Sequence, residues 1–89
     1  MIREKVTVIS KEGLHARPAD TLIRLANQFD AKVELVCGED KVINAKSILH
    51  VLGAGIDCGT EIEVVCDGSD EREANEAIVR AIKNGLDEH

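Results

Sequence analysis

The sequence predicts an α+β protein built as a two-layer, open-faced sandwich, in which one sheet carries helices on a single face. Three observations lead to this fold class. Four short segments read as strands, most of them alternating apolar and polar residues. Two long segments repeat apolar residues at helical spacing, and a shorter third helix lies between them. The resulting order along the chain is β-α-β-β-α-β-α, and two packed layers bury these apolar faces.

The predicted strands are short and bounded by turn residues. In the first strand, Val6 and Val8 lie on one face, and in the second Val33 and Leu35 do the same. The turn Gly38-Glu39-Asp40 joins the second strand to the third as a hairpin. The four strands are predicted at Ile2–Ile9, Lys32–Cys37, Lys41–Asn44 and Thr60–Cys66.

The predicted helices carry recognisable end signals. Ser47 is placed to cap the short middle helix, whose length is below what is stable without packing. Asp70 and Glu73 resemble a capping box at the start of the last helix, and Gly85 fits its C-cap. The three helices are predicted at Ala16–Gln28, Ser47–Leu52 and Asp70–Gly85.

Length, charge and hydropathy exclude several classes of protein. A chain of 89 residues corresponds to one domain, residues 1–89, with an aliphatic core because Phe29 is the only aromatic residue. The formal net charge of −6 argues against a nucleic-acid partner. No apolar run approaches the roughly 20 residues of a membrane span. The charges in Met1–Lys5 do not fit a signal peptide, so we expect a cytoplasmic protein.

The cysteines do not suggest a disulfide or a metal site. Cys37, Cys58 and Cys66 are odd in number and form no CxxC pair, so three free thiols are expected in a reducing compartment. Together with His15 and His50 their spacing matches no ligand pattern. The sequence therefore predicts neither a metal nor a cofactor.

The segment with the most distinctive chemistry is Gly13-Leu14-His15-Ala16-Arg17-Pro18-Ala19. Pro18 fits a first helical turn, which puts His15 at or next to the N-cap. The free backbone N–H groups of Ala16 and Arg17 then form an anion site, and the Arg17 guanidinium lies within reach of the same anion. Because imidazole is a competent nucleophile, the segment predicts a nucleophile facing a phosphate cradle. A plain polar helix cap at His15 is the alternative.

This segment resembles the active-site signature of the HPr family, the histidine-containing phosphocarriers of the phosphoenolpyruvate:sugar phosphotransferase system. A second segment, Asn44-Ala45-Lys46-Ser47-Ile48-Leu49, is similar to the family segment that holds a regulatory serine. Chain length and element order also fit, so the resemblance covers essentially the whole chain. It implies an antiparallel sheet in strand order 1-4-2-3 with three helices on one face.

The resemblance also implies a function for two of these residues. His15 would accept phosphate on its δ nitrogen from enzyme I, which takes it from phosphoenolpyruvate, and pass it to sugar-specific IIA domains. Arg17 would be the supporting cation. Ser47 would be phosphorylated by an HPr kinase/phosphorylase, although a simple N-cap is the alternative. The protein is then a monomeric carrier and not an enzyme, since no second acid–base residue is evident beside His15.

Family members dock partners through the short helix, and the matching positions define a predicted docking surface. Ile48, Leu49 and Leu52 would be exposed, while Val51 would face the core. The implied topology brings the end of this helix close to His15, where small residues leave room for a partner or simply stop the helix. The predicted docking residues are Asp20, Ile48, Leu49, His50, Leu52, Gly53, Ala54 and Gly55, of which Asp20, His50 and Gly53 depart from the usual family pattern.

Two other functions remain open at the level of sequence. One is a regulatory binding module in which the Ser47 surface controls other proteins and His15 only tunes it. The intact His15, Arg17 and Pro18 favour the carrier over this module. The other is a phosphorelay that regulates nitrogen or carbon use without moving sugar, which the sequence does not separate from sugar uptake.

Overall fold

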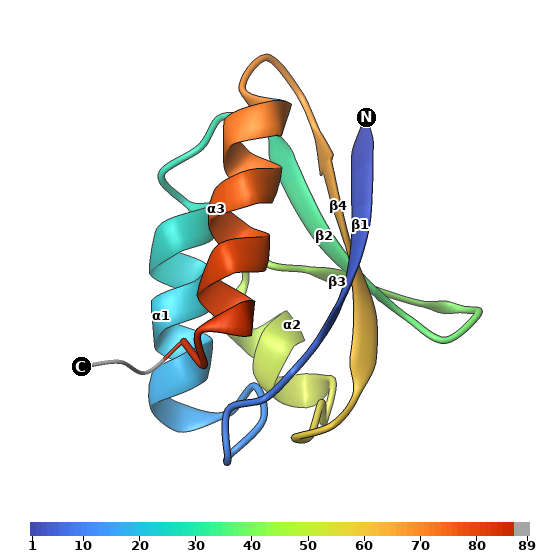
Figure 1. Cartoon of the computed structure of the whole chain (residues 1–89), viewed down its shortest axis with the longest axis vertical. Helices are drawn as coiled ribbons and strands as arrows, with labels where there is room; N and C mark the ends of the chain where they lie inside the picture. The colour runs from blue at the N-terminus through green and yellow to red at the C-terminus, as the bar shows by residue number, and fades with distance from the viewer. Residues whose placement is uncertain (87–89) are drawn as a thin grey trace.

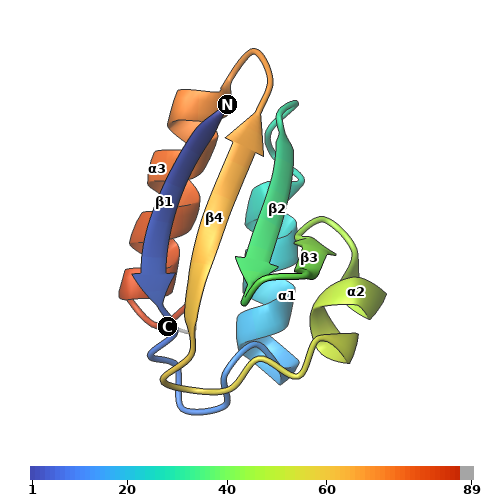
Figure 2. The ribbon, with the colours of Figure 1, turned by 90° about the vertical axis from the view of Figure 1, so that its right-hand side faces the viewer.

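The computed structural model describes residues 1–86 and confirms the predicted fold class. One four-stranded sheet has the order β1-β4-β2-β3, and all neighbouring strands are antiparallel. The helices cover one face of this sheet and leave the other open (Figures 1 and 2). The elements are β1 Ile2–Thr7, α1 Ala16–Ala26, β2 Lys32–Cys37, β3 Lys41–Asn44, α2 Ile48–Gly53, β4 Glu61–Asp67 and α3 Glu71–Lys83. The single domain predicted for residues 1–89 extends over Asp87, Glu88 and His89, which lie outside the described residues.

The core between the two layers is aliphatic, as predicted. Val64 of the central strand β4 pairs with Leu35 of β2, and both are fully buried beneath α1 and α3. Leu22 and Ile78 fill the layer from the helix side, and Phe29 packs only at its margin. The sheet's other face is mixed, because the alternate residues that point outward include Glu34 and Glu63 but also Val36, Val42 and Val65.

Three predicted element ends shift by two residues, those of β1, α1 and α3, and α3 ends at Lys83. β1 ends at Thr7, since Val8 leaves the strand register although its N–H still donates to Thr60 O at 2.9 Å. α1 ends at Ala26, and the side chain of its C-cap, Asn27, donates to Ile23 O and Lys46 O. These side-chain bonds end the helix before Gln28.

The capping box predicted for α3 is wrong. Asp70 is the N-cap, but its side chain makes no bond to its own helix. Its carboxylate instead accepts from Asp30 N at 2.9 Å and Ala31 N at 2.8 Å, which ties α3 to the loop after α1. The hydrogen bond from Asp30, followed by that from Ala31, lowers the pKa of the Asp70 carboxyl. Gly85 follows the C-cap instead of forming it, at φ +91°.

Within residues 1–86, no helix is long and apolar enough to cross a membrane.

Candidate functional site

His15 stands at the N-cap of α1, as the sequence predicts. Its backbone is extended, with φ −128° and ψ 165°, and its side chain makes no capping hydrogen bond. The first intrahelical bond runs from Ala19 N to His15 O, and Pro18 has no N–H to satisfy. The amide groups of Ala16 and Arg17 are therefore the first-turn donors without a side-chain cap. The imidazole is 40% exposed, so a partner can reach it.

The backbone around His15 is held in an unusual shape. Ala16 adopts φ +50°, a left-handed conformation that is rare outside glycine and costs about 1–2 kcal/mol. Gly13, at φ +66°, lies against the backbone of Ile56 and Asp57, and an added Cβ would come within 2.7 Å of Asp57 Cα. The Ser10 hydroxyl donates to Gly13 O at 2.6 Å and closes the preceding turn. These contacts fix the approach of the chain to His15.

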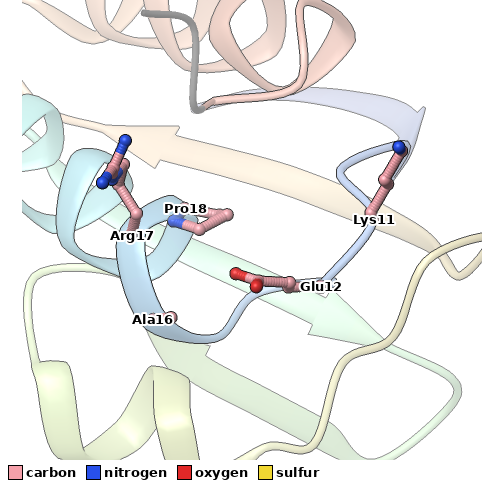
Figure 3. A pocket seen from close by; sticks show the side chains of 5 residues that line it. All are labelled: Lys11, Glu12, Ala16, Arg17 and Pro18. Carbon is pink, nitrogen blue, oxygen red and sulfur yellow. The ribbon is translucent and has the colours of Figure 1, made fainter.

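An open hollow of about 470 Å³ lies at the start of α1 (Figure 3). Ala16, Arg17 and Pro18 line it from the helix, and Lys11 and Glu12 line it from the preceding turn. Arg17 is exposed, as its proposed cationic role needs. Lys11 and Glu12 were not among the residues predicted from the sequence to form the site. Their position only three and four residues before His15 is the signal that could have found them.

One expectation about this site is wrong, because a carboxylate does lie beside His15. Asp57 Oδ1 is 3.8 Å from His15 Nε2. Asp57 follows the helix stop Gly53-Ala54-Gly55, whose predicted position near His15 is borne out by the bond from Leu14 N to Ile56 O at 2.8 Å. Following the implied topology two residues past Gly55 would have found Asp57.

The short helix α2 presents the surface that the sequence predicts. Val51 is fully buried, whereas Ile48, Leu49 and Leu52 are 42%, 80% and 40% exposed. Ser47 is the N-cap, and its hydroxyl oxygen accepts from His50 N at 3.3 Å. The predicted placement of all five side chains is therefore confirmed.

The remaining predicted docking residues lie around α2 and on α1. Asn44 N donates to His50 Nδ1 at 3.1 Å, so the imidazole is held against the end of β3. Gly53 and Gly55 are exposed, and Ala54 is half-buried. On α1, Asp20 pairs with Arg24 at 3.0 Å, so the charge it adds near His15 is partly offset.

The cysteines are spread over the molecule. Cys66 is buried in the core, and burial raises the pKa of its thiol. Cys37 is half-buried and Cys58 is exposed, and all three are free. Among the described residues, no three side chains of metal-ligand type come together.

Comparison with known proteins shows which class of protein this site and fold belong to. The family model described as "PTS HPr component phosphorylation site" matches residues 2–84. The molecule is thus a phosphocarrier of the phosphotransferase system. More narrowly, the chain belongs to the HPr family.

Individual relatives agree over nearly the whole chain. The phosphocarrier protein HPr of Treponema pallidum is 41% identical over 88 residues, which are 99% of both chains. An HPr-C-His crystal structure from Thermoanaerobacter tengcongensis has a TM-score of 0.91 at 32% identity, covering 100% of this chain and 99% of that one. An HPr dimer from the same organism has a TM-score of 0.74 at 34% identity, covering 96% and 99%. The last example shows that some members of the family dimerise.

Proposed function

We propose that His15 is the residue that carries the phosphoryl group, on its δ nitrogen. The observation that carries this proposal is that His15 heads a helix whose first-turn amides have no side-chain cap. A phosphoryl group on the ring would gain the amides of Ala16 and Arg17, the positive helix end and the Arg17 guanidinium. A phosphorus–nitrogen bond is labile, which suits a group that is passed on.

The donor and acceptors follow from the family. Phosphorylated enzyme I, charged by phosphoenolpyruvate, gives the group to His15, and sugar-specific IIA domains take it. The partners dock on the exposed residues Ile48, Leu49 and Leu52, with His50 and Asp20 at the rim. The small residues Gly53, Ala54 and Gly55 leave space for the partner's own histidine. The carrier works in the cytoplasm as a monomer, needs no cofactor and has no turnover activity of its own.

Ser47 is proposed as the regulatory site, modified by an HPr kinase/phosphorylase. A phosphate there adds about −1.5 to −2 charges beside the apolar docking residues. Desolvating this charge against a partner's surface is costly, so docking weakens. A regulatory binding module and a nitrogen or carbon relay are the rival functions, and only the carrier requires rapid transfer from His15 to a sugar-specific IIA domain.

The test is incubation with enzyme I and phosphoenolpyruvate, followed by intact mass and acid-lability analysis. The wild-type protein should gain one acid-labile phosphoryl group. His15→Ala should gain none while keeping its fold, because His15 contributes no side-chain cap. The matched histidine variant His50→Ala should still gain the group, more slowly if His50 contacts the partner. Undiminished labelling of His15→Ala would exclude His15 as the carrier residue.

A further inference from the structure

Two segments far apart in sequence bring a carboxylate to the imidazole of His15. Asp57 Oδ1 lies 3.8 Å from His15 Nε2. His15 begins α1, whereas Asp57 lies in the loop between α2 and β4. The contact therefore depends on how firmly these two segments are joined.

Backbone hydrogen bonds hold the loop on both sides of Asp57, one to the residue before His15 and one to the residue that follows β1. Leu14 N donates to Ile56 O at 2.8 Å, directly before the two residues in question. Gly59 N donates to Val8 O at 2.7 Å, and Gly13 packs against Asp57 Cα. The Asp57 backbone is thus fixed beside His15, while its side chain is 82% exposed and can rotate. At 3.8 Å the two groups are in contact but not hydrogen-bonded, and a small rotation of the exposed Asp57 side chain would bring a carboxylate oxygen within hydrogen-bond distance of Nε2.

We propose that Asp57 is a positioning residue for His15: it accepts the Nε2 proton and so holds the ring in the tautomer whose Nδ1 carries the free lone pair. This inference rests on the proposed function of His15 as phosphoryl acceptor. A hydrogen bond at one ring nitrogen decides which of the two nitrogens is protonated. A carboxylate can only accept, so it selects one tautomer.

With the proton on Nε2, every bond and charge in the phosphoryl transfer is accounted for. The Nδ1 lone pair forms the new nitrogen–phosphorus bond, while the bond from phosphorus to the donor breaks and its electron pair goes to the donor. The proton on Nε2 stays in place, so the ring becomes positively charged. The Asp57 carboxylate stabilises that charge, and the events reverse when the group is handed on.

The same carboxylate also repels the phosphoryl oxygens, so the two effects must be weighed. Asp57 contacts the nitrogen that keeps its proton, whereas phosphorus binds the other nitrogen. The attraction to the charged ring therefore acts over the shorter distance. The hollow in front of α1 is lined by two cations, Arg17 and Lys11, and one carboxylate, Glu12, so its net positive charge opposes the repulsion.

The tautomer can be measured without any phosphoryl donor, by ¹⁵N NMR of the imidazole in alkaline buffer where the ring is neutral. We expect the wild-type ring to carry its proton on Nε2. Asp57→Asn should raise the fraction protonated on Nδ1 several-fold, because an amide can also donate to Nε2. Asp57→Glu should restore the wild-type ratio. Asp40→Asn, which removes the same charge from the exposed turn between β2 and β3, should leave the ratio unchanged.

The kinetic counterpart is the rate of phosphorylation by enzyme I. Asp57→Asn and Asp57→Ala should each lower it about tenfold, by analogy with the lower end of the loss when a metal-bound histidine loses its orienting carboxylate. Asp57→Glu should recover most of the rate. A wild-type tautomer ratio in both Asp57→Asn and Asp57→Ala would overturn the proposal. A faster phosphorylation rate in these variants would also overturn the proposal. It would show that repulsion between Asp57 and the phosphoryl oxygens dominates.

The two proposals fail in different ways. Labelling that persists in His15→Ala contradicts the proposed function. Labelling that depends on His15, together with an unchanged tautomer in the Asp57 variants, contradicts only the role of Asp57.

Discussion

The N-termini of α1 and α2 are built in opposite ways. At α1, the side chain of His15 makes no capping bond, and the next residue, Ala16, takes a left-handed φ of +50°. At α2, the Ser47 hydroxyl accepts from a backbone amide, and the chain enters the helix without strain. One end keeps its donors available, and the other uses a side chain to satisfy one of them.

The difference follows from what else holds each helix. α1 has 11 residues and buries Pro18, Ala19, Leu22 and Ala26, so tertiary packing stabilises it without a cap. α2 has six residues and buries only Val51, so a cap contribution of about 1 kcal/mol matters more. An anion site can therefore be left open on the well-packed helix, whereas the poorly packed helix needs its serine.

The largest expected effect comes from Gly13→Ala, which breaks the arrangement at α1. The new methyl group meets the backbone of Ile56 and Asp57, and it also pays the left-handed cost at φ +66°. We expect the free energy of unfolding, measured in urea, to fall by about 3 kcal/mol. Gly38→Ala is the matched control, because Gly38 has the same φ of +66° but nothing within 4 Å. It should lose only about 1–2 kcal/mol. Equal losses in the two variants would show that the Gly13 contact contributes nothing.

This contact also marks the limit of prediction from the sequence. The position of His15 at the N-cap followed from the local order of Gly13, His15 and Pro18, whereas the exposure pattern of α2 came from the family resemblance. The strand order came from the family resemblance and not from the pattern of residues. Local signals extend only a few residues.

The features that were missed depend on contacts between distant segments. Asp57 reaches His15 only because the loop after α2 is bonded to Leu14. Asp70 binds the amides of Asp30 and Ala31 about forty positions earlier, where the sequence suggested a local capping box. The left-handed φ of Ala16 is also invisible locally, since alanine favours an ordinary helix start.

The next largest effect tests the role of the uncapped N-terminus of α1. Arg17→Ala removes a charge-assisted partner of the phosphoryl group, which we expect to slow phosphorylation about thirtyfold, equivalent to roughly 2 kcal/mol. Arg17→Lys keeps the charge but lacks the planar guanidinium, so its rate of phosphorylation should lie between those of Arg17→Ala and wild type. Arg80→Ala removes an exposed arginine from α3 and should change the rate little. Unchanged transfer in Arg17→Ala would mean that the helix end suffices alone.

Substitutions of Ser47 test the capped end and separate its two roles. Ser47→Ala loses the cap and should lower the free energy of unfolding by about 1 kcal/mol. The apparent Michaelis constant of enzyme I for this protein should be unaltered. Ser47→Asp keeps a capping oxygen but adds charge, so stability should hold while the Michaelis constant rises about tenfold, or roughly 1.4 kcal/mol.

Replacing Leu49 by glutamate should reproduce the kinetic effect of Ser47→Asp, since Leu49 is 80% exposed on the same surface. The ¹⁵N spectrum of His15 should stay the same in both variants. Ser47 and Leu49 lie at the start of α2, whereas the bond between Leu14 and Ile56 follows the end of that helix. If the Michaelis constant of Ser47→Asp equals that of wild type, Ser47 acts only as a helix cap.

The smallest expected effect is that of Ala16→Gly, which removes the strain that distinguishes the α1 end from the α2 end. Glycine relieves a left-handed cost of about 1–2 kcal/mol but adds about 0.5–1 kcal/mol of unfolded-state entropy. The free energy of unfolding should therefore rise by about 0.5 kcal/mol. Ala77→Gly, the same change inside α3, relieves no strain and should lower it by about 1 kcal/mol. Phosphorylation of Ala16→Gly should be slower than that of wild type, because the amides beside His15 lose their fixed direction. A loss of stability equal to that of Ala77→Gly would show that the φ of Ala16 carries no strain and that the two helix ends differ only in their caps.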